Sequence, residues 1–575
     1  MPLQNQDIAN DFEKLADLIE IAGANRFRVR AYRNAAATLR GLERPVRQMV
    51  DAGEDLSALP DIGDDLAGQI REYAHTGHLA KLDQASETLP PRIITLLDLP
   101  GLGPKRVHAL HEGLGVCDRD DLAQAARAGR VRELSGFGEK LEARILQALS
   151  REANAPAARM LLATAEASAE PLLAWLRSLA GVEKASIAGS YRRRRDTVGD
   201  LDIVVTARDA AAVSAAVTGY EAVAEVRSSG ETRSTVVLRN GLQVDIRVMP
   251  ARSYGAAMHY FTGSRAHNIA LRRRAQQRDL KLNEYGVFRG DEAIAGRTEA
   301  EVYQALSLPW IAPELRENRG EIAAAEAGTL PALVTPEAIR GNLHTHTTAS
   351  DGKAGLTQMV RAAVDRGWAY LGISDHSQAL RMANGLDAKR LGEQMEAIDR
   401  LNDDDPGLLV LKSCEVDILR DGRLDLPDAV LERLDYVIAA VHSDLGLDRK
   451  AQTRRILRAM ENPRVTILAH PTGRLINRRQ PMALDMEAIC RAAADQGVVL
   501  EVNAQPQRLD LDDRDIMMAL EAGARLSIGT DAHMPDHYDY MRYGVDQARR
   551  GWASADAIIN TLSPTALRRV LAARR

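Results

Sequence analysis

The sequence contains few aromatic residues, few cysteines and no long apolar run. Phe, Trp and Tyr make up 4% of the 575 residues, so the cores must be built mainly from Ala, Leu, Val and Ile. The three cysteines show no C-x-x-C spacing, which argues against a disulfide framework and favours a reducing compartment. No apolar stretch approaches the ~18 residues of a membrane helix, and the N-terminus has no signal-peptide pattern. We therefore expect a cytoplasmic protein without a membrane partner.

The chain also lacks an excess of positive charge, because its formal net charge is −5 at pH 7. This balance argues against binding of nucleic acid by bulk electrostatic attraction, although local basic clusters can still bind a phosphate backbone. Hydrophobic residues make up 45% and charged residues 27% of the chain, as in ordinary globular proteins. The length is too great for one domain and predicts three or more.

The most informative segment, residues 189–205, combines a turn, a run of arginines and an apolar strand. Because side chains alternate along a strand, Asp200 and Asp202 point from the same face. Two carboxylates that face the same way repel each other unless a cation lies between them. Donors for phosphate oxygens come from one hydroxyl, two open glycine backbones and the arginine run: Ser190, Gly189, Gly199 and residues 192–195.

A predicted β-hairpin supplies a third carboxylate. Residues 235–238 and 244–248 read as two strands around Asn240-Gly241, which is a strong two-residue turn signal. Asp245 is the only acid in the second strand. A D-x-D pair by itself is equally well explained by a solvated strand face. Three carboxylates beside a phosphate-binding turn instead favour nucleotidyl transfer assisted by two metal ions.

G-S-x-R-R followed by G-D-x-D resembles the palm motif of family X DNA polymerases, and the likeness runs from about residue 5 to about residue 310. The resemblance implies that Asp200, Asp202 and Asp245 are catalytic and hold two Mg²⁺ or Mn²⁺ ions. Residues 260–264, Y-F-T-G-S, match the family segment that lies under the sugar of the incoming nucleotide. The implied nucleotide contacts are Gly189, Ser190, Arg193, Gly199, Tyr260, Phe261, Gly263 and Asn268, and Arg272 is the implied template contact.

Three positions depart from the family pattern. Asn154 and Gln243 stand where many relatives carry arginines near the triphosphate and the primer end, which puts those two contacts in doubt. Gln69 stands where members with 5′-deoxyribose-phosphate lyase activity carry a nucleophilic lysine. An amide cannot form the required imine, so we expect no lyase activity by that route.

The region before the palm motif is predicted to be helical, with an apolar face repeating along residues 7–50 and a further helix over residues 156–180. Between them, residues 59–67, 99–107 and 134–142 share a tight turn that starts a helix. This helix–hairpin–helix pattern presents backbone N–H groups to a phosphate and binds DNA independently of sequence. Asp61 replaces the first glycine of the first repeat. The candidate DNA contacts are Gly101, Gly103, Gly136 and Gly138.

The C-terminal half carries histidines and acids at the ends of short apolar runs. Strand and helix patterns alternate there, which is typical of a (β/α) barrel with its site at the carboxyl ends of the strands. A single histidine at such a position is more often structural, but six with acids at equivalent positions indicate a metal cluster. The set resembles that of the PHP (polymerase and histidinol phosphatase) domain, which binds up to three Mn²⁺, Zn²⁺ or Fe ions and hydrolyses phosphoesters: His344, His346, Asp351, His376, Glu415, His442, His470, Asp531 and His533.

We therefore predict a multidomain chain: a helical helix–hairpin–helix region, an α+β nucleotidyltransferase palm and a distorted (β/α) barrel PHP domain. The expected boundaries place an N-terminal helical domain, a DNA-binding subdomain, the palm, a nucleotide-binding subdomain, a linker and the PHP domain at residues 1–85, 86–155, 156–250, 251–315, 316–338 and 339–575.

The resemblance implies a DNA polymerase that fills short gaps during repair, with gapped or primed DNA and dNTPs as partners. It adds a metal-dependent 3′→5′ exonuclease in the PHP domain and leaves cleavage at abasic sites open. We expect a monomer. Two alternatives remain: a 3′-end-processing nuclease or phosphatase whose polymerase half is mainly a DNA-binding platform, or a scaffold at strand breaks.

Overall fold

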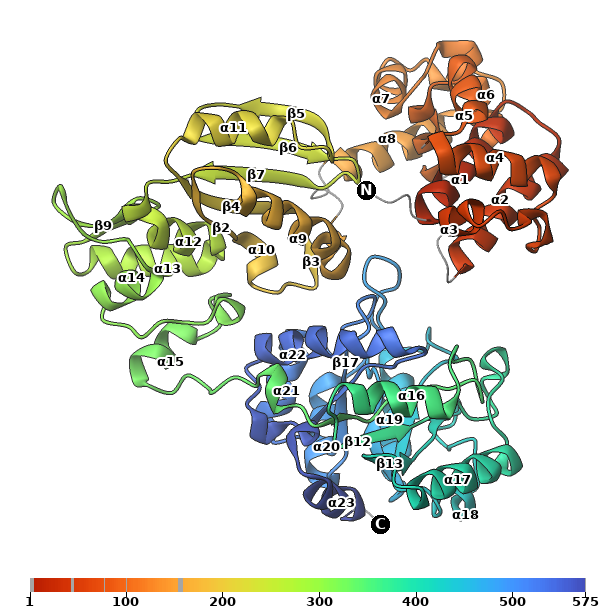
Figure 1. The fold of residues 1–575 in the computed structure, drawn as a ribbon, viewed down its shortest axis with the longest axis vertical. Helices are drawn as coiled ribbons and strands as arrows, with labels where there is room; N and C mark the ends of the chain where they lie inside the picture. Colours follow the sequence, from red (N-terminus) through yellow and green to blue (C-terminus); the bar gives the residue numbers. More distant parts are fainter. Residues whose placement is uncertain (1–4, 43–45, 77, 100, 154–158, 574–575) are drawn as a thin grey trace. The chain divides into compact units, whose positions relative to one another are not determined.

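The chain forms two compact units, residues 1–157 and 158–575 (Figure 1). The computed structural model describes residues 5–42, 46–76, 78–99, 101–153 and 159–573. Within these ranges no helix combines the length and the apolar character needed to cross a membrane.

The first unit is entirely helical where the structure describes it. The predicted apolar face of the N-terminal region is confirmed, because Ile8 and Phe12 are fully buried and Phe12 packs edge-on against Tyr32 with 5.6 Å between ring centroids. The helices are α1 (Asn5–Ile21), α2 (Arg26–Gly41), α3 (Val46–Asp51), α4 (Asp64–Thr76), α5 (Ala80–Thr88), α6 (Pro104–Leu114), α7 (Arg119–Arg127) and α8 (Glu139–Ala153).

Each of the three predicted hairpin turns immediately precedes a helix, namely α4, α6 or α8. The first turn residue is in the left-handed region in all three repeats, with φ of +90° at Gly101, +85° at Gly136 and +59° at Asp61. Aspartate is one of the few non-glycine residues that tolerate this conformation, because its short side chain can hydrogen-bond locally. The first repeat therefore keeps the turn although its glycine is missing.

The second unit begins with a five-stranded sheet in the order β2 (Val182–Ile187), β4 (Asp200–Ala207), β7 (Gln243–Val248), β6 (Arg233–Leu238) and β5 (Val223–Ser229). β4 and β7 are parallel, and the other neighbours are antiparallel. Helices α9 (Leu162–Ser178) and α11 (Ala210–Thr218) pack on the sheet, and Figure 1 shows α11 lying along β5 and β6. The predicted hairpin around Asn240-Gly241 is β6–β7.

The helix predicted over residues 156–180 is shorter in the structure. α9 begins at Leu162, and the short strand β1 (Met160–Leu161) precedes it and pairs with β3 (Thr197–Val198). The apolar periodicity of the segment does not distinguish these two residues from a first helical turn, because their partner lies far along the chain. Asn154, where a triphosphate contact was in doubt, lies outside the described residues.

A smaller subdomain follows the sheet and includes the first part of the segment expected to be a linker, whereas Val334 packs in the core of the barrel. Leu315 and Ala325 belong to its apolar core, and Glu321 is fully buried with its carboxylate 2.6 Å from Nδ1 of His267. Residues 316–327 are therefore packed against this subdomain and do not run as a free tether. The domain boundaries themselves stay predictions. The elements are α12 (Tyr254–Thr262), α13 (Arg265–Gln276), β8 (Lys281–Asn283), β9 (Gly286–Arg289), β10 (Glu292–Ala295), α14 (Glu299–Ala305) and α15 (Glu321–Ala327).

The C-terminal half is the predicted distorted barrel of parallel strands. The strands are β11 (Gly341–Asn342), β12 (Tyr370–Ile373), β13 (Leu409–Lys412), β14 (Glu415–Asp417), β15 (Val437–Ala440), β16 (Val465–Leu468), β17 (Val499–Asn503) and β18 (Leu526–Gly529). β13 and β14 are two pieces of one strand. A bridge between Thr345 and Ala532 joins the extensions of the first and last strands, and one between His376 and Glu415 spans the break.

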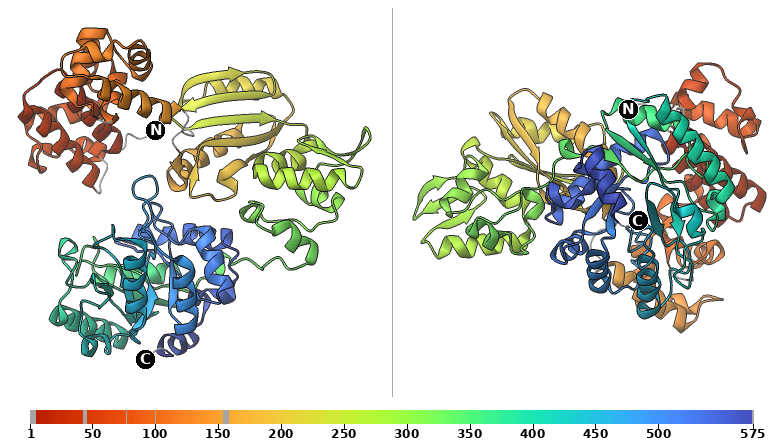
Figure 2. Two further views of the ribbon diagram at one scale, coloured as in Figure 1. Left: turned by 180° about the vertical axis from the view of Figure 1, so that it is seen from behind. Right: turned by 90° about the horizontal axis from the view of Figure 1, so that it is seen from below.

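Helices lie around the outside of these strands, as both views in Figure 2 show. They are α16 (Leu356–Asp365), α17 (Ala388–Asp403), α18 (Asp428–Leu431), α19 (Arg449–Met460), α20 (Met486–Gln496), α21 (Asp513–Glu521), α22 (Met541–Arg550) and α23 (Pro564–Ala572). The strand residues are almost all buried on both faces, as expected for a parallel sheet covered by helices.

Candidate functional sites

The three predicted palm carboxylates come together where β4 and β7 begin. Asp202 and Asp245 are direct neighbours in the parallel ladder, and Asp200 lies two residues earlier on the same face of β4. Asp245 is 6% exposed, whereas Asp200 is exposed at the start of its strand. The sheet therefore places three acids on one face at one edge, as the sequence predicted. Because β4 and β7 are far apart in sequence, this adjacency depends on the strand order.

Electrostatics at this edge favour a bound cation. Burial, followed by the negative charges of Asp200 and Asp245, raises the pKa of Asp202 to about 7. The positive charges of Arg247 and Arg193 lower the pKa of Asp202, but by less than burial and the two acids raise it. Burial would also raise the pKa of Asp245, but hydrogen bonds from Thr235, Gln243 and Arg233 outweigh it and lower that pKa. A divalent cation would relieve the repulsion that holds a proton on Asp202.

Gln243 and Arg233 are contacts of this site that the sequence did not assign. The Gln243 side-chain amide donates to one oxygen of Asp245 at 2.8 Å, and Arg233 donates to the other at 3.1 Å. The glutamine that replaces the family arginine thus contacts a candidate metal ligand. The pairing of β6 with β7 brings Arg233 there, and no local motif marks it.

The predicted phosphate turn lies directly against the carboxylates. Gly189 has φ of +62°, and a Cβ atom at this position would lie 2.6 Å from a carboxylate oxygen of Asp202. Only a glycine allows this approach. The buried hydroxyl of Ser190, in the short helix α10 (Gly189–Arg192), has no hydrogen-bond partner among the described residues. An unpaired buried hydroxyl beside three acids fits a site for a ligand oxygen.

The arginine run differs from the expected set of open phosphate donors, because each of its four side chains lies near a carboxylate. Arg192 is 2.6 Å from Glu299, and Arg193 is 3.1 Å from Glu317. Arg194 is 2.6 Å from Asp546, and Arg195 is 3.8 Å from Glu317. The run therefore connects the palm to later parts of the chain.

The remaining predicted nucleotide contacts cluster on α12 and α13. The Arg193 guanidinium donates to the carbonyl of Thr262, next to Gly263, and Arg247 lies 4.4 Å from the Phe261 ring centroid. The Asn268 amide nitrogen donates to the Tyr260 carbonyl at 2.7 Å, while its buried amide oxygen has no partner among the described residues. Arg272 lies over the Tyr260 ring at 5.8 Å. Gly199 lies beside Arg159, whose Nη1 would be 3.1 Å from a Cβ atom at this glycine.

The predicted DNA contacts of the hairpin repeats lie in the first unit. Gly103 is the N-cap of α6, and Gly138 directly precedes α8, so both sit where a helix N-terminus can present N–H groups. Gln69 is buried on α4, accepts a hydrogen bond from the Tyr32 hydroxyl at 3.1 Å and donates to Asp65. The absence of lyase activity stays a prediction.

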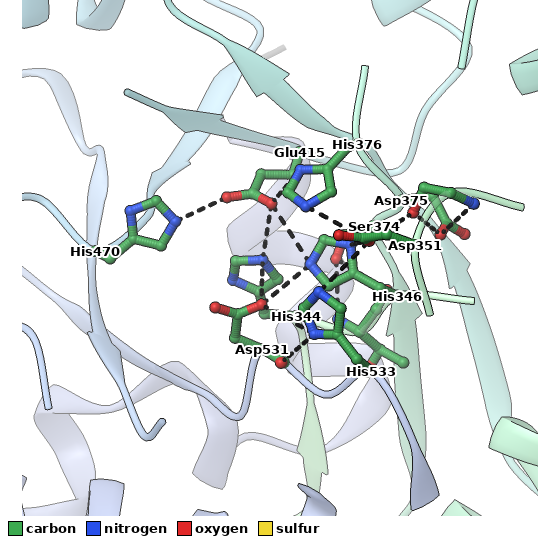
Figure 3. A network of polar contacts seen from close by, with 12 residues as sticks. His344, His346, Asp351, Ser374, Asp375, His376, Glu415, His470, Asp531 and His533 are labelled. Carbon is green, nitrogen blue, oxygen red and sulfur yellow. Dashed lines mark hydrogen bonds and ion pairs between the residues drawn. The ribbon is translucent and has the colours of Figure 1, made fainter. Parts of the chain in front are cut away.

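The nine predicted ligands of the C-terminal half converge at the carboxyl ends of the barrel strands, where Figure 3 shows most of them directed toward one another. Glu415 lies at the centre. One of its oxygens is 2.9 Å from Nδ1 of His376, and the other is 2.9 Å from Nε2 of His470. Three groups have ligand atoms close enough to share an ion: His346 with Asp351, His376 and His533; His344 with His346 and Asp531; and His376 with Glu415 and His442.

These residues fit divalent metal ions. Buried nitrogens of His344, His346, His376 and His470 and one buried oxygen of Glu415 have no hydrogen-bond partner among the described residues. Buried polar atoms are otherwise almost always paired. Mixed imidazole and carboxylate ligands suit Zn²⁺, Mn²⁺ and Fe, so the donor set matches the predicted metals without selecting among them.

Residues outside the predicted set orient the ligands. Glu501 on β17 is buried; one oxygen lies 2.6 Å from Nδ1 of His344, and the other accepts the backbone N–H of His470 at 2.8 Å. Asp375 is also buried and accepts hydrogen bonds from Thr347, Ser350 and Gln394. Glu501 lies in the middle of β17, within an apolar run, and an acid in such a run is the signal that could have marked it.

Replacing Glu501 should weaken metal binding, because an acid that accepts from a ligating imidazole fixes its orientation and raises its basicity. We expect Glu501→Gln to lower the metal affinity of the histidine cluster by about 10- to 100-fold. Metal content after dialysis against a graded chelator measures this. Glu487→Gln, an exposed position on the neighbouring helix α20, is the control. Unchanged retention in Glu501→Gln would contradict the role of this residue.

Metal binding to this cluster should also release protons. Burial lowers the pKa of His442, but Glu415 and Asp417 raise it to about 10. Burial likewise lowers the pKa of His533, but Asp351 and Asp531 raise it to about 9. In the metal-free protein both imidazoles are therefore protonated at neutral pH, and a protonated imidazole cannot bind a metal.

The affinity for Mn²⁺ should accordingly rise as the pH increases from about 6 to about 9. Calorimetric titration in buffers of different ionisation enthalpy measures both the affinity and the protons released. The titration uses the Asp202→Asn variant, because it lacks one candidate ligand of the palm site and so reduces the share of the Mn²⁺ signal that comes from that site. An affinity independent of pH above 7 would contradict the expectation.

Models of known families match most of the chain between residues 3 and 505. A helix-hairpin-helix domain matches residues 3–79, and a SAM-like helix-hairpin-helix tandem matches residues 93–151. The palm of DNA polymerase beta matches residues 164–259, and its thumb matches residues 257–317. A PHP domain matches residues 342–505.

Individual relatives agree with this division. DNA polymerase/3′-5′ exonuclease PolX of Bacillus subtilis (strain 168) is 37% identical over 565 residues, which cover 98% of each chain. DNA polymerase lambda of Rattus norvegicus is 25% identical over 347 residues, 54% of this chain and 56% of its own. A probable phosphatase of Syntrophotalea carbinolica is 28% identical over 236 residues, 39% of this chain and 93% of its own. The chain therefore belongs to the family X DNA polymerases that carry a C-terminal PHP domain.

Proposed function

We propose that this protein is a DNA-directed DNA polymerase that fills short gaps during repair and removes 3′-terminal nucleotides with its PHP domain. The observation that carries the proposal is that two groups of candidate metal ligands each converge in one chain. Asp200, Asp202 and Asp245 share one edge of the palm sheet, and eight histidines and acids form the ion-sized groups of the barrel, with His470 in contact with Glu415. Both activities depend on divalent metals.

In the palm, Asp200, Asp202 and Asp245 would hold two Mg²⁺ or Mn²⁺ ions. Bound there, the ions lower the pKa of the primer 3′-hydroxyl and stabilise the charge that develops on the transferred phosphorus and the departing pyrophosphate. The unpaired Ser190 hydroxyl would bind a triphosphate oxygen, and the Arg193 guanidinium, which also pairs with Glu317, would bind another. Tyr260 and Phe261 would support the sugar, and the free amide oxygen of Asn268 would face the base.

In the PHP domain, the nine ligands would hold up to three Mn²⁺, Zn²⁺ or Fe ions. Bound there, the ions supply a water molecule of lowered pKa for attack on the terminal phosphodiester. Glu415 contacts His344, His346, His376, His442 and His470 and would keep these imidazoles aligned for binding. Glu501 and Asp375 orient ligands and hold the loop that carries them.

The test uses a 5′-labelled primer facing a one-nucleotide gap whose downstream strand bears a 5′-phosphate. The primer is incubated with Mg²⁺ or Mn²⁺, with and without dNTPs. Extension with dNTPs and shortening without them are expected. Shortening alone would indicate a nuclease whose polymerase half serves as a platform. A primer that is neither extended nor shortened would favour the scaffold at strand breaks.

A second candidate activity is removal of a 3′-phosphate. It is supported by probable phosphatases that match 38–39% of this chain over about nine tenths of their own length. A primer ending in a 3′-phosphate distinguishes the two reactions. Release of inorganic phosphate without shortening would assign a phosphatase, whereas release of nucleotides would assign the exonuclease.

A further inference from the structure

The turn that carries the candidate triphosphate contacts is held by residues of the PHP domain. Its residue Arg193 offers its backbone carbonyl to Nη1 of Arg550 at 2.6 Å. Arg550 is the last residue of α22, 357 positions further along the chain. Both side chains are largely buried: that of Arg550 is 2% exposed and that of Arg193 is 13% exposed.

The same arginine also reaches the partner of the Arg193 side chain. Nη1 of Arg550 lies 3.2 Å from Oε1 of Glu317, and this oxygen accepts from Nε of Arg193 at 3.1 Å. The other end of the Arg550 guanidinium donates to Asp513 on α21. Arg550 therefore contacts the backbone of Arg193 directly and its side chain through Glu317. Buried charges of this kind are tolerated because each is paired, and loss of one partner leaves the others uncompensated.

Neighbouring contacts show that the later residues of the turn also contact the PHP domain. Arg194, whose φ is +54°, donates from Nε to Asp546 on α22 at 2.6 Å. The Tyr543 hydroxyl of the same helix donates to Glu166 of the palm at 2.6 Å. Arg474 lies 3.3 Å from Asp196 at the end of the turn. The start of the turn, in contrast, lies against Asp202, so movement of its outer side would displace groups at the catalytic edge.

We propose that Arg550 is a positioning residue of the polymerase reaction, which holds Arg193 where the triphosphate of the incoming nucleotide binds. The inference rests on the proposed polymerase function and extends it, because it makes the PHP domain a structural part of the nucleotide site. A domain that only hydrolyses DNA ends would require no contact with this turn. Removal of Arg550 should then weaken nucleotide binding without affecting the hydrolytic site.

The main test compares Arg550→Ala with Arg549→Ala. Arg549 is the preceding residue of the same helix and pairs with Glu314 at 2.9 Å and with the Val334 carbonyl at 2.8 Å, but these contacts do not include the turn. Both variants remove one positive charge from the contact between α22 and the polymerase half of the chain. We expect Arg550→Ala to raise the KM for dNTP by about tenfold, with a smaller change in kcat and unchanged exonuclease activity. Arg549→Ala should keep the wild-type KM.

A rescue experiment separates positioning from general destabilisation. Guanidinium ion at millimolar concentration can occupy the space left in Arg550→Ala and should lower the raised KM toward the wild-type value, while Arg549→Ala should not respond. If Arg550→Ala does not fold, Asp513→Asn replaces it, because this variant leaves every direct contact of the turn in place and acts through Arg550 and Arg319. It should also raise the KM.

The outcomes separate this inference from the proposed function. A wild-type KM in the folded Arg550→Ala variant, or an equal rise in Arg549→Ala, would overturn the positioning role alone. A parallel loss of kcat, exonuclease activity and thermal stability without rescue would also overturn it and indicate a purely structural contact. Failure of the wild-type protein to extend any primer would overturn the polymerase function and this inference with it.

Discussion

Asp202→Asn is expected to reduce nucleotide addition by about a thousandfold or more, because ligation of a catalytic ion by a carboxylate contributes several kcal/mol to the transition state. The negative charges of both other acids act on Asp202. It neighbours Asp245 in the ladder, and the Gly189 turn approaches its carboxylate. The amide keeps the size of the side chain but removes the charge, so the change should act on ion binding with little effect on packing. Single-turnover extension of the gapped primer measures it.

The same variant should retain hydrolysis of the primer end, because the PHP ligands are all supplied by the barrel. Asp291→Asn, at an exposed position of the same unit, controls for loss of one negative charge. Loss of both activities in Asp202→Asn would mean that the two sites do not act independently. Undiminished nucleotide addition would exclude Asp202 as a metal ligand.

Glu415→Gln should have the converse effect and lower 3′→5′ exonuclease activity by about a thousandfold. Its carboxylate is the group around which the histidines gather, with five imidazoles within 3.5 Å or less. Burial would raise its pKa, but the surrounding histidines hold it well below its usual range, so the group is ionised and available to a metal. An amide at this position removes the negative charge and halves the number of acceptor oxygens.

Shortening of a labelled primer in Mn²⁺ without dNTPs measures this effect, and elemental analysis of the purified variant should show less bound metal. Gap filling by Glu415→Gln should stay at the wild-type rate. Glu393→Gln on α17 is an exposed control of the same chemistry. Exonuclease activity equal to wild type in Glu415→Gln would remove this residue from the proposed metal site.

The candidate sites were predictable because each ligand is marked by local sequence. Asp200 and Asp202 share a strand face through the two-residue period, and Asp245 follows a turn that fixes its hairpin. Most PHP ligands lie at or just beyond the end of a buried strand, whereas Asp351 lies in the loop that follows β11. The glycines of the hairpin repeats signal left-handed turns, and the structure adds that Asp61 adopts the same conformation without glycine.

Contacts between distant segments were not predictable in this way. The arginine run reads as a set of phosphate donors, whereas three of its members pair with Glu299, Glu317 and Asp546, between 107 and 352 residues away. The segment after residue 315 reads as a linker from its composition, but His267 binds the buried Glu321. Partners of this kind leave no periodic signal, because either residue alone resembles an ordinary surface charge.

The sequence by itself determined most of the strands and turns and the candidate residues of the two sites, because period, turn chemistry and residue type are local properties. Tertiary structure decided which of these elements became neighbours. The parallel pairing of β4 with β7 places Asp245 beside Asp202, and the packing of α22 against the palm places Arg550 on Arg193. Such placement follows from burial of whole sheet and helix faces, a collective property that no short segment of sequence contains.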